Sequence, residues 1–294
     1  ESSSFFSLGG SEINTSISLA NNNNQVYLIS SLPKNELGKE FLDILQTRNI
    51  QTKYIHLSEE HQIIGSVYVK NNHVFYQRQY SCFSFLNLMN IDLESIFSQH
   101  FDWCHLTGIT PLLSVGNYLI WRELIENCII SKISISLDLN YRSSLREFEY
   151  LWQLVKPFLS NFELFIISIS DISLIANIEK INISKLSFEE QLLLLSKRLH
   201  ISKLVVCKKD ILSDRTQNRS SYLVYQEQIY QSKIKNHAPK EFIGGGDAFV
   251  GSLINSFLKN NLSQIDNISI QNILEIADHY TIDIQNEVGN FPKF

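Results

Sequence analysis

Cysteine is scarce in this sequence: only four occur among its 294 residues, and no two of them form a C-x-x-C pair. Neither a cysteine zinc site nor a disulfide framework is therefore predicted. Buried free thiols in a reducing compartment are the expected state. The four positions are Cys82, Cys104, Cys128 and Cys207.

Long hydrophobic runs and an excess of positive charge are also missing. No apolar run approaches the roughly twenty residues of a membrane-spanning helix, and the first residues do not form a basic and then apolar secretion signal. Lys and Arg number 25 against 30 Asp and Glu, a net charge of −5, whereas a nucleic-acid binder usually presents a basic face. We expect a cytoplasmic protein that acts on a small molecule, with no membrane or nucleic-acid partner.

Apolar residues, by contrast, make up 44% of the chain, enough at this length to bury a full core. Strand-like apolar runs alternate with helical patterns through most of the sequence, which predicts a central, mainly parallel sheet with right-handed crossovers. Strands are expected at residues 26–31, 133–137, 164–167 and 204–208, within 101–109, and as two runs within 222–230. Helices are expected at residues 15–20, 39–48, 248–258 and 274–283.

The most informative stretch is residues 241–251, which read E-F-I-G-G-G-D-A-F-V-G. The glycines Gly244 to Gly246 allow the backbone to approach an anion closely, and the helix that follows would direct unpaired N–H groups at a phosphate. Asp247 is suited to accept a proton from a hydroxyl beside that phosphate. Phosphoryl transfer to an alcohol is one interpretation, and a tight turn in which Asp247 only caps the helix is the other.

A second glycine pair, Gly9-Gly10, stands before the short helix expected at residues 15–20. Asn14 follows four residues after Gly10, where it could line a pocket or cap the helix. From the local sequence alone, a turn and a helix cap are the more frequent outcome.

Together the two stretches resemble motifs of the PfkB (ribokinase-like) carbohydrate kinases, G-G-x-x-x-N and D-x-x-G-A-G-D. Glu241 stands for the leading Asp of the second motif and Gly245 for its Ala, whereas Gly246-Asp247 is intact. The resemblance covers nearly the whole chain. It implies an α/β fold, a three-layer sandwich with a central mainly parallel sheet and a small β lid, formed by residues 1–294 as one domain.

The same resemblance implies the reaction and its participants. Asp247 would activate a sugar hydroxyl, while the amides of Gly244, Gly245 and Gly246 stabilise the transferred phosphoryl group, with ATP as donor and Mg²⁺ as the cation. Gly10 and Asn14 would contact the sugar. Relatives carry a further strand of the central sheet before the first motif, and that strand is apparently missing at this N-terminus.

A β-hairpin is expected from residues 63–69 and 73–78, and in this family such strands form the lid, here within residues 1–8 and 63–82. Tyr76-Gln77-Arg78 resembles a Y-x-R element of the 2-keto-3-deoxygluconate kinases, in which Tyr and Arg contact the acid sugar, and Tyr68 would be a second lid tyrosine. The guanidinium of an arginine suits a carboxylate. Half-exposed strand positions for Tyr76 and Arg78 are the alternative.

The strand expected at residues 133–137 delivers Asp138-Leu139-Asn140-Tyr141-Arg142 at its C-terminal end, where open α/β sheets place their ligands. These residues resemble the D-x-N-x-R element of the family, which implies substrate contacts from Asn140 and Arg142. Two arginines, Arg78 and Arg142, could neutralise the carboxylate of a sugar acid. An ordinary salt bridge of Arg142 is the alternative.

The nucleotide side departs further from the family. Ser168 to Asp171 stands where relatives carry N-x-x-E or S-x-x-E, so Ser168 is expected at the nucleotide and Asp171 at the magnesium shell through water. Lys208 ends the strand nearest the nucleotide, where Gly244 and Gly246 would also contact ATP. Residues 209–213 contain no glycine, although relatives have a G-x-x-G turn there.

The resemblance is closest to the 2-keto-3-deoxygluconate (2-dehydro-3-deoxygluconate) kinases and predicts ATP-dependent formation of the 6-phosphate. A fructokinase- or ribokinase-like enzyme and a degenerate, non-catalytic relative are the alternatives. Glu241, the glycine-free residues 209–213, Asn290 and the missing first strand favour the latter, and the intact Gly246-Asp247 opposes it. An exposed lid edge favours a homodimer or a higher homo-oligomer.

Overall fold

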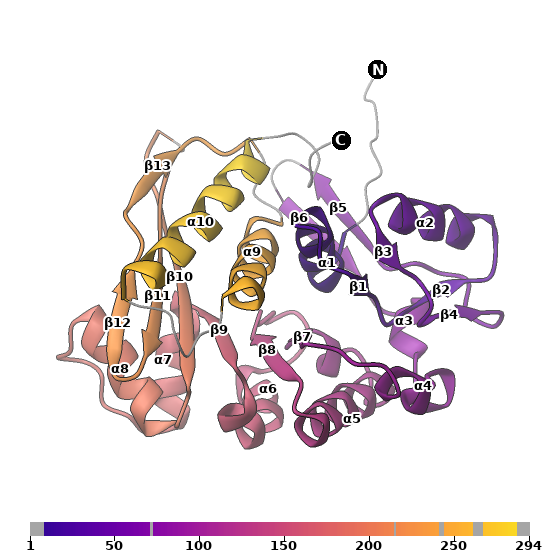
Figure 1. Ribbon diagram of the computed structural model, residues 1–294, viewed down its shortest axis with the longest axis horizontal. Helices are drawn as coiled ribbons and strands as arrows, with labels where there is room; N and C mark the ends of the chain where they lie inside the picture. The colour runs from indigo at the N-terminus through magenta and orange to yellow at the C-terminus, as the bar shows by residue number, and fades with distance from the viewer. Residues whose placement is uncertain (1–8, 71–72, 215, 241–243, 261–266, 287–294) are drawn as a thin grey trace.

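The computed structural model describes residues 9–70, 73–214, 216–240, 244–260 and 267–286. Its centre is a seven-stranded mixed sheet (Figure 1). The strands are β7 (Trp103–Thr107), β8 (Ser134–Asp138), β9 (Leu164–Ser168), β10 (Lys203–Ile211), β11 (Gln217–Tyr225), β12 (Gln228–Gln231) and β13 (Lys235–His237). Their order is β12-β11-β10-β9-β8-β7, and β13 pairs with β11. The strands β7 to β10 are parallel, as predicted, and the C-terminal strands add an antiparallel edge.

Helices cover both faces of this sheet (Figure 1). One layer holds α5 (Val115–Ser131), α6 (Phe148–Val155), α7 (Ile169–Ile178) and α8 (Phe188–Arg198), and the other holds α1 (Ser11–Asn21), α9 (Gly245–Lys259) and α10 (Asn267–Gln285). Strand β9 shows why both layers form. Phe165 and Ile167 join the cluster with α5 to α8, whereas Leu164 and Ile166 join the cluster with α9 and α10, because alternate side chains of a strand point to opposite faces. The predicted three-layer sandwich is confirmed.

The N-terminal part forms smaller sheets beside this core. The strand expected at residues 26–31 is two short strands, β1 (Val26–Tyr27) and β2 (Ser30–Pro33), which pair in parallel with β3 (Ile50–Gln51) and β4 (Ile55–Ser58) around α2 (Glu36–Thr47). The predicted hairpin is present as β5 (Ser66–Lys70) and β6 (His73–Gln77). The other lid strand, expected within residues 1–8, falls outside the described residues.

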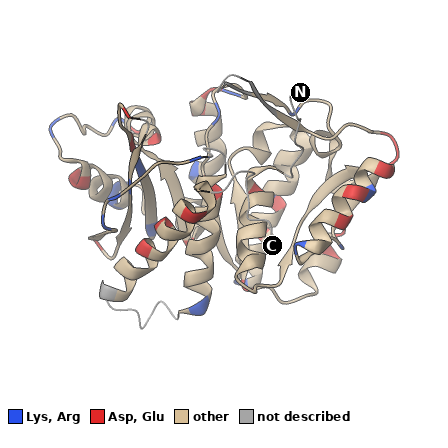
Figure 2. Cartoon of the chain, turned by 90° about the horizontal axis from the view of Figure 1, so that it is seen from above, with Lys and Arg blue, Asp and Glu red and all other residues tan. Residues whose placement is uncertain are grey.

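Short helices complete the chain between these elements. They are α3 (Cys82–Phe85), η1 (Leu88–Asn90), α4 (Leu93–Phe97), η2 (Thr110–Leu112) and η3 (Lys156–Asn161). None of the described helices is both long enough and apolar enough to traverse a lipid bilayer. Figure 2 shows acidic and basic residues interspersed over the described elements, in keeping with the small net charge of −5.

Strand β10 is longer than the sequence predicted. Its expected end at residue 208 is wrong, because the antiparallel register with β11 continues from Lys208↔Ser220 to Ile211↔Gln217. Residues 209–211 are therefore strand, and the chain turns only after them.

Close packing of α1 on α9 joins an early and a late segment of the chain. A Cβ atom added to Gly251 would stand 2.5 Å from Cβ of Ser18 and 3.0 Å from the carbonyl oxygen of Thr15. The absence of a side chain at Gly251 thus lets the two helices approach, and the first turn of α9 lies against the first turns of α1.

Candidate active site

A cavity of about 2660 Å³ separates the N-terminal part and its lid from the C-terminal ends of the parallel strands. Eleven of the predicted site residues line it, although they come from distant parts of the sequence. They are Gly10, Asn14, Tyr76, Arg78, Asn140, Arg142, Ser168, Asp171, Gly244, Gly246 and Asp247.

Three predicted residues are placed differently. Gly245 is buried, and a Cβ there would stand 2.7 Å from Nε2 of Gln285, so it packs against α10 instead of lining the cavity. The backbone of Tyr68 pairs with Phe75 in the lid hairpin, while its side chain falls outside the described part of the structure. Lys208 is not among the lining residues.

The neighbour of Lys208, Lys209, lines the cavity instead. Lys208 and Lys209 are consecutive residues of β10, and consecutive side chains of a strand point to opposite faces, so only one of them can face the cavity. Lys208 lies on the α8 side, with its ammonium 5.7 Å from the ring centre of Phe188 and 3.8 Å from Asp210. Lys209 lies on the side of α9, with Cys207.

Asp247 stands in the first turn of α9 and is held by side chains of α1. Ser11 Oγ donates to Oδ1 at 2.7 Å and Asn14 Nδ2 donates to Oδ2 at 2.7 Å. Burial raises the pKa of Asp247 to about 6, against the lowering effect of these two hydrogen bonds. The carboxyl is therefore mostly ionised at neutral pH, with a pKa close enough to 7 for general-base chemistry.

Two glycines give the backbone around Asp247 its shape. Gly10, which caps α1, has a φ of 128°, and Gly244, which caps α9, has a φ of 79°. Such values are unfavourable for residues with a side chain. A Cβ added to Gly246 would meet no atom of the described residues within 4 Å, and Gly246 lines the cavity, so the N-terminus of α9 faces it, as binding of an anion there requires.

Asp138 ends β8 and Asn140 follows it, and both line the cavity. Asn140 has a φ of 39°, donates its backbone N–H to Oδ1 of Asp138 at 3.1 Å, and donates Nδ2 to Oγ of Ser11 at 2.7 Å. Burial, followed by repulsion from Asp247, raises the pKa of Asp138 to about 8. Of these two neighbouring carboxyls, Asp138 thus keeps its proton near neutral pH while Asp247 does not.

Arg78 and Arg142 bring positive charge to the same cavity. The Arg78 guanidinium lies 4.0 Å from the ring centre of Tyr76, and Nε of Arg142 is buried without a hydrogen-bond partner. Neither forms an ion pair with a described residue. Desolvation lowers the pKa of Arg78, and repulsion from Arg142 lowers it further. Two unpaired guanidiniums close enough to repel each other form a site for an anion.

Ser11 and Glu12 belong to this site but were not singled out from the sequence. Glu12 Oε1 accepts hydrogen bonds from Thr107 and Thr110, each at 2.6 Å, and its side chain lines the cavity. Ser11 lies three residues before Asn14, on the same side of α1, and this helical spacing was the available signal.

Asp171 is largely committed to its own helix. Its Oδ2 accepts from the backbone N–H of Ser168 at 2.8 Å and from Oγ of Ser168 at 2.7 Å. These two hydrogen bonds cap the N-terminus of α7. Burial raises the pKa of Asp171. Oδ1 keeps no partner among the described residues, so it can meet the cavity through water. Within the described chain no three His, Cys, Asp or Glu side chains are grouped as a metal site, and a magnesium ion would therefore rest mainly on phosphate and water oxygens.

Comparison with known proteins identifies the family of the chain and structures of similar fold. A model of the pfkB family of carbohydrate kinases matches residues 3–277. The 2-dehydro-3-deoxygluconokinase of Thermotoga maritima is similar with a TM-score of 0.84 and 23% identity, over 97% of this chain and 85% of that one. The fructokinase of Xylella fastidiosa, with bound ATP, gives a TM-score of 0.77 at 16% identity, over 96% and 86% of the two chains.

The fructokinase of Vibrio cholerae O395, with fructose, ADP and calcium bound, gives a TM-score of 0.76 at 17% identity, over 96% of this chain and 86% of that one. No protein with a curated description matches the sequence. At these identities the solved structures establish the fold, whereas the family match extends over most of the sequence. The chain belongs to the pfkB family of carbohydrate kinases.

Proposed function

We propose that this kinase transfers the γ-phosphoryl group of ATP to the primary hydroxyl of 2-dehydro-3-deoxy-D-gluconate and forms the 6-phosphate. The observation that carries the proposal is the pair of guanidiniums, Arg78 and Arg142, which line the cavity that also holds Asp247 and form no ion pair with a described residue. The likeness to the Thermotoga maritima enzyme supports the same substrate class.

Asp247 is the proposed general base. Ser11 and Asn14 fix the orientation of its carboxylate, and a pKa of about 6 leaves it ionised at neutral pH. A sugar hydroxyl within hydrogen-bond distance of this carboxylate would give up its proton as the oxygen attacks phosphorus. Ser11 already donates to Oδ1 and Asn14 to Oδ2, so the substrate hydroxyl must share one of these oxygens or displace one of the two donors.

The N-terminus of α9 is the proposed site for the phosphates. Its open side at Gly246 leaves room for a bulky anion, and the helix dipole with unpaired amides favours negative charge there. Magnesium bound with ATP supplies positive charge to the phosphate oxygens. Asp171 would hold that ion through water at Oδ1, because Oδ2 caps α7.

Arg78 and Arg142 would determine the choice of substrate. A carboxylate can accept paired hydrogen bonds from a guanidinium, whereas a neutral ketose would offer neither arginine an anionic group to bind. Arg78 follows lid strand β6 and Arg142 follows β8, so a bound sugar acid would tie the lid to the central sheet and exclude water.

A neutral ketose is the second candidate substrate, because the fructokinases named above are similar over the same length. In that case the two arginines would contact hydroxyl groups of the sugar or phosphate groups of ATP, and a sugar acid would bring no advantage.

The test is phosphoryl transfer by the purified chain at saturating magnesium, with 2-dehydro-3-deoxygluconate, fructose, ribose and gluconate offered separately. Highest kcat/KM for the keto acid supports the proposal. Highest kcat/KM for fructose or ribose refutes the substrate but keeps the reaction. Absence of turnover with all four, when calorimetry also detects no ATP binding, would favour a non-catalytic relative.

A further inference from the structure

Lys209 is the one lysine of strand β10 that lines the cavity. It stands directly opposite Arg219 in the antiparallel pair of β10 and β11. Two cations at directly opposite positions repel each other, so this pair needs negative charge close by. Arg219 has a carboxylate partner inside the protein, whereas Lys209 has none among the described residues.

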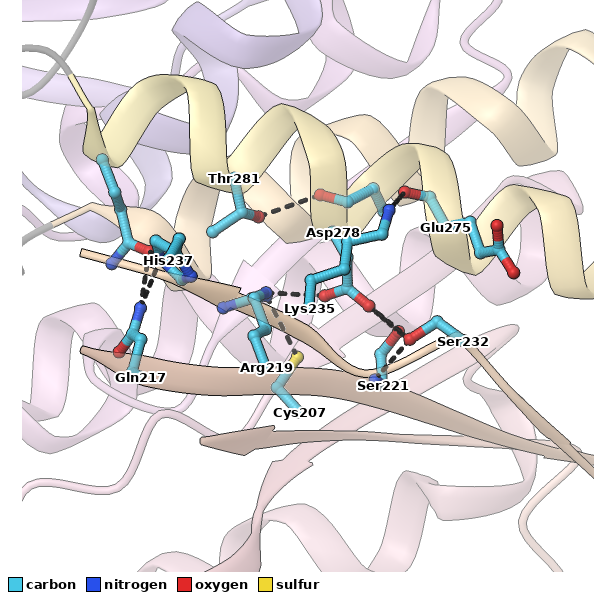
Figure 3. Close-up of polar contacts among 12 residues, drawn as sticks. Cys207, Gln217, Arg219, Ser221, Ser232, Lys235, His237, Glu275, Asp278 and Thr281 are labelled. Carbon is cyan, nitrogen blue, oxygen red and sulfur yellow. Dashed lines mark hydrogen bonds and ion pairs between the residues drawn. The ribbon is translucent and has the colours of Figure 1, made fainter. Parts of the chain in front are cut away.

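Arg219 is neutralised inside the protein. Its Nε donates to Oδ1 of Asp278 at 2.6 Å, and both side chains are fully buried (Figure 3). Oδ2 of Asp278 accepts from Ser221 at 2.7 Å and from Ser232 at 2.6 Å. The carboxylate and guanidinium thus form a buried ion pair between β11 and α10, although Nη1 of Arg219 has no hydrogen-bond partner there. Arg219 cannot leave Asp278 without leaving an unpaired buried charge.

Lys209 has no such partner. Its ammonium makes no hydrogen bond or ion pair with a described residue, and its side chain is exposed in the cavity. Desolvation by the surrounding protein, followed by repulsion from Arg219, lowers the pKa of Lys209, and Cys207, Asp247 and Asp138 oppose this change. Asp138 keeps its proton to a pH of about 8, so it supplies little negative charge near neutral pH.

Lys209 also faces the element that best suits an anion. It lies on the same side of the sheet as α9, and the N-cap Gly244 and the first-turn residue Gly246 of that helix line the same cavity. An anion between Lys209 and the α9 N-terminus would receive a charge-assisted contact from one side and backbone N–H groups from the other.

We propose that Lys209 is a phosphate-binding residue, which contacts the phosphates of the phosphoryl donor opposite the N-terminus of α9. Arg219 positions Lys209, because repulsion between the two side chains keeps the Lys209 ammonium extended away from Arg219 and into the cavity. This inference rests on the proposed kinase function for the identity of the ligand. It also explains how the phosphoryl donor can bind beside residues 209–213, which contain no glycine. The cationic side chain of Lys209 would contact the phosphates in place of a closely approaching backbone.

The experiment is calorimetric titration of inorganic tripolyphosphate, and separately of Mg-ATP, into the full chain. The variants are Lys209→Met, Lys209→Arg and, as matched control, Lys208→Met, which removes the same charge from the opposite face of the strand. Loss of one contact to a highly charged ligand should raise Kd for tripolyphosphate about tenfold or more in Lys209→Met. Lys209→Arg should recover most of that loss, and Lys208→Met should change Kd less than about twofold.

Equal tripolyphosphate affinity in Lys209→Met and in the unaltered chain would overturn the assignment, and so would equal losses in the Lys208 and Lys209 variants. Failure of the unaltered chain to bind tripolyphosphate would overturn it as well. The proposed function fails separately, when the unaltered chain binds Mg-ATP but phosphorylates no sugar. Thermal unfolding of each variant identifies any that is misfolded, and Lys209→Gln then takes the place of Lys209→Met.

Discussion

The hydroxyl of Ser11 donates a hydrogen bond of 2.7 Å to Oδ1 of Asp247, a residue 236 positions away in the sequence. The same hydroxyl accepts Nδ2 of Asn140 at 2.7 Å. Ser11 thus connects the first turn of α1, the loop after β8 and the start of α9. It holds Asp247 in one orientation, and it stabilises the ionised form of that carboxyl.

Replacing Ser11 should therefore shift the pH dependence of the enzyme. A general base must be deprotonated, so kcat/KM should fall as the pH drops below the Asp247 pKa of about 6. Ser11→Ala removes a hydrogen bond that lowers this pKa, so the acid limb of the profile should move to higher pH. Ser18→Ala is the control, because Ser18 bonds only the carbonyl of Ala248. An acid limb at the same pH in both variants would contradict the role of Ser11.

Asp247→Asn should lower kcat by about 10²- to 10⁴-fold, the usual contribution of a general base. The fold should tolerate the change, because Oδ1 of an asparagine still accepts from Ser11, and the Asn14 amide, whose Oδ1 is buried without a partner, can turn to accept the new N–H. Single-turnover kinetics with a saturating sugar measure the effect, and thermal unfolding confirms the fold. Turnover within about threefold of the unaltered enzyme would exclude general-base catalysis by Asp247.

Arg142→Met should reduce the preference for a sugar acid over a neutral ketose. Loss of a charge-assisted contact to a carboxylate should raise KM for 2-dehydro-3-deoxygluconate about tenfold or more, with a smaller effect on fructose. The control is Arg122→Met, which removes a surface arginine paired with Glu126 at 3.1 Å. Equal losses on both sugars in Arg142→Met would place Arg142 outside substrate discrimination.

The fold and the centre of the site could be predicted because their signals are local. Buried parallel strands are continuous apolar runs, as β9 is, and the residue types of Gly10, Asn14 and Asp247 occur at fixed spacings beside a helix start. Ser11 and Glu12 lie between these positions but become site residues only through Asp247, Thr107 and Thr110, which tertiary packing brings to them. The helical spacing of Ser11 to Asn14 places both on one side of α1, but the contacts themselves join distant segments and cannot be read from local sequence.

The alternation of side chains along a strand explains why Lys209, and not the predicted Lys208, lines the cavity. The residue type, lysine, is the same at both positions, so composition cannot distinguish them, and the face of each is set by the register of β10 with β11. The buried pair of Arg219 and Asp278 is likewise invisible locally, since its two charges lie 59 residues apart and charged residues are usually expected on the surface.

Gly251→Ala should destabilise the protein by roughly 1–3 kcal/mol, the usual cost of an overpacked core position. The added methyl would stand 2.5 Å from Cβ of Ser18, an atom held by the backbone of α1, so the helices must separate. Denaturant unfolding measures the loss, and kcat should fall because Asp247 moves away from Ser11. Gly65→Ala is the control, with its closest contact at 3.5 Å. Equal stability in the two variants would show that α1 and α9 can adjust freely.

Asp138 should make the stability of the protein decrease with pH. Burial and the charge of Asp247 raise its pKa to about 8 in the folded state, from an ordinary value of 3.8. Between these two pH values the folded chain holds a proton that the unfolded chain has lost, so the free energy of unfolding falls as the pH rises. Asp138→Asn mimics the protonated form and keeps an oxygen for the N–H of Asn140. In urea unfolding, the Asp138→Asn variant should therefore gain stability relative to the unaltered chain as the pH increases from 5 to 8. The control, Asp43→Asn at an exposed position of α2, should show no such gain. Parallel stability curves for the Asp138 variant and the unaltered chain would mean that Asp138 ionises normally, and the charge balance around Lys209 would then include a second carboxylate.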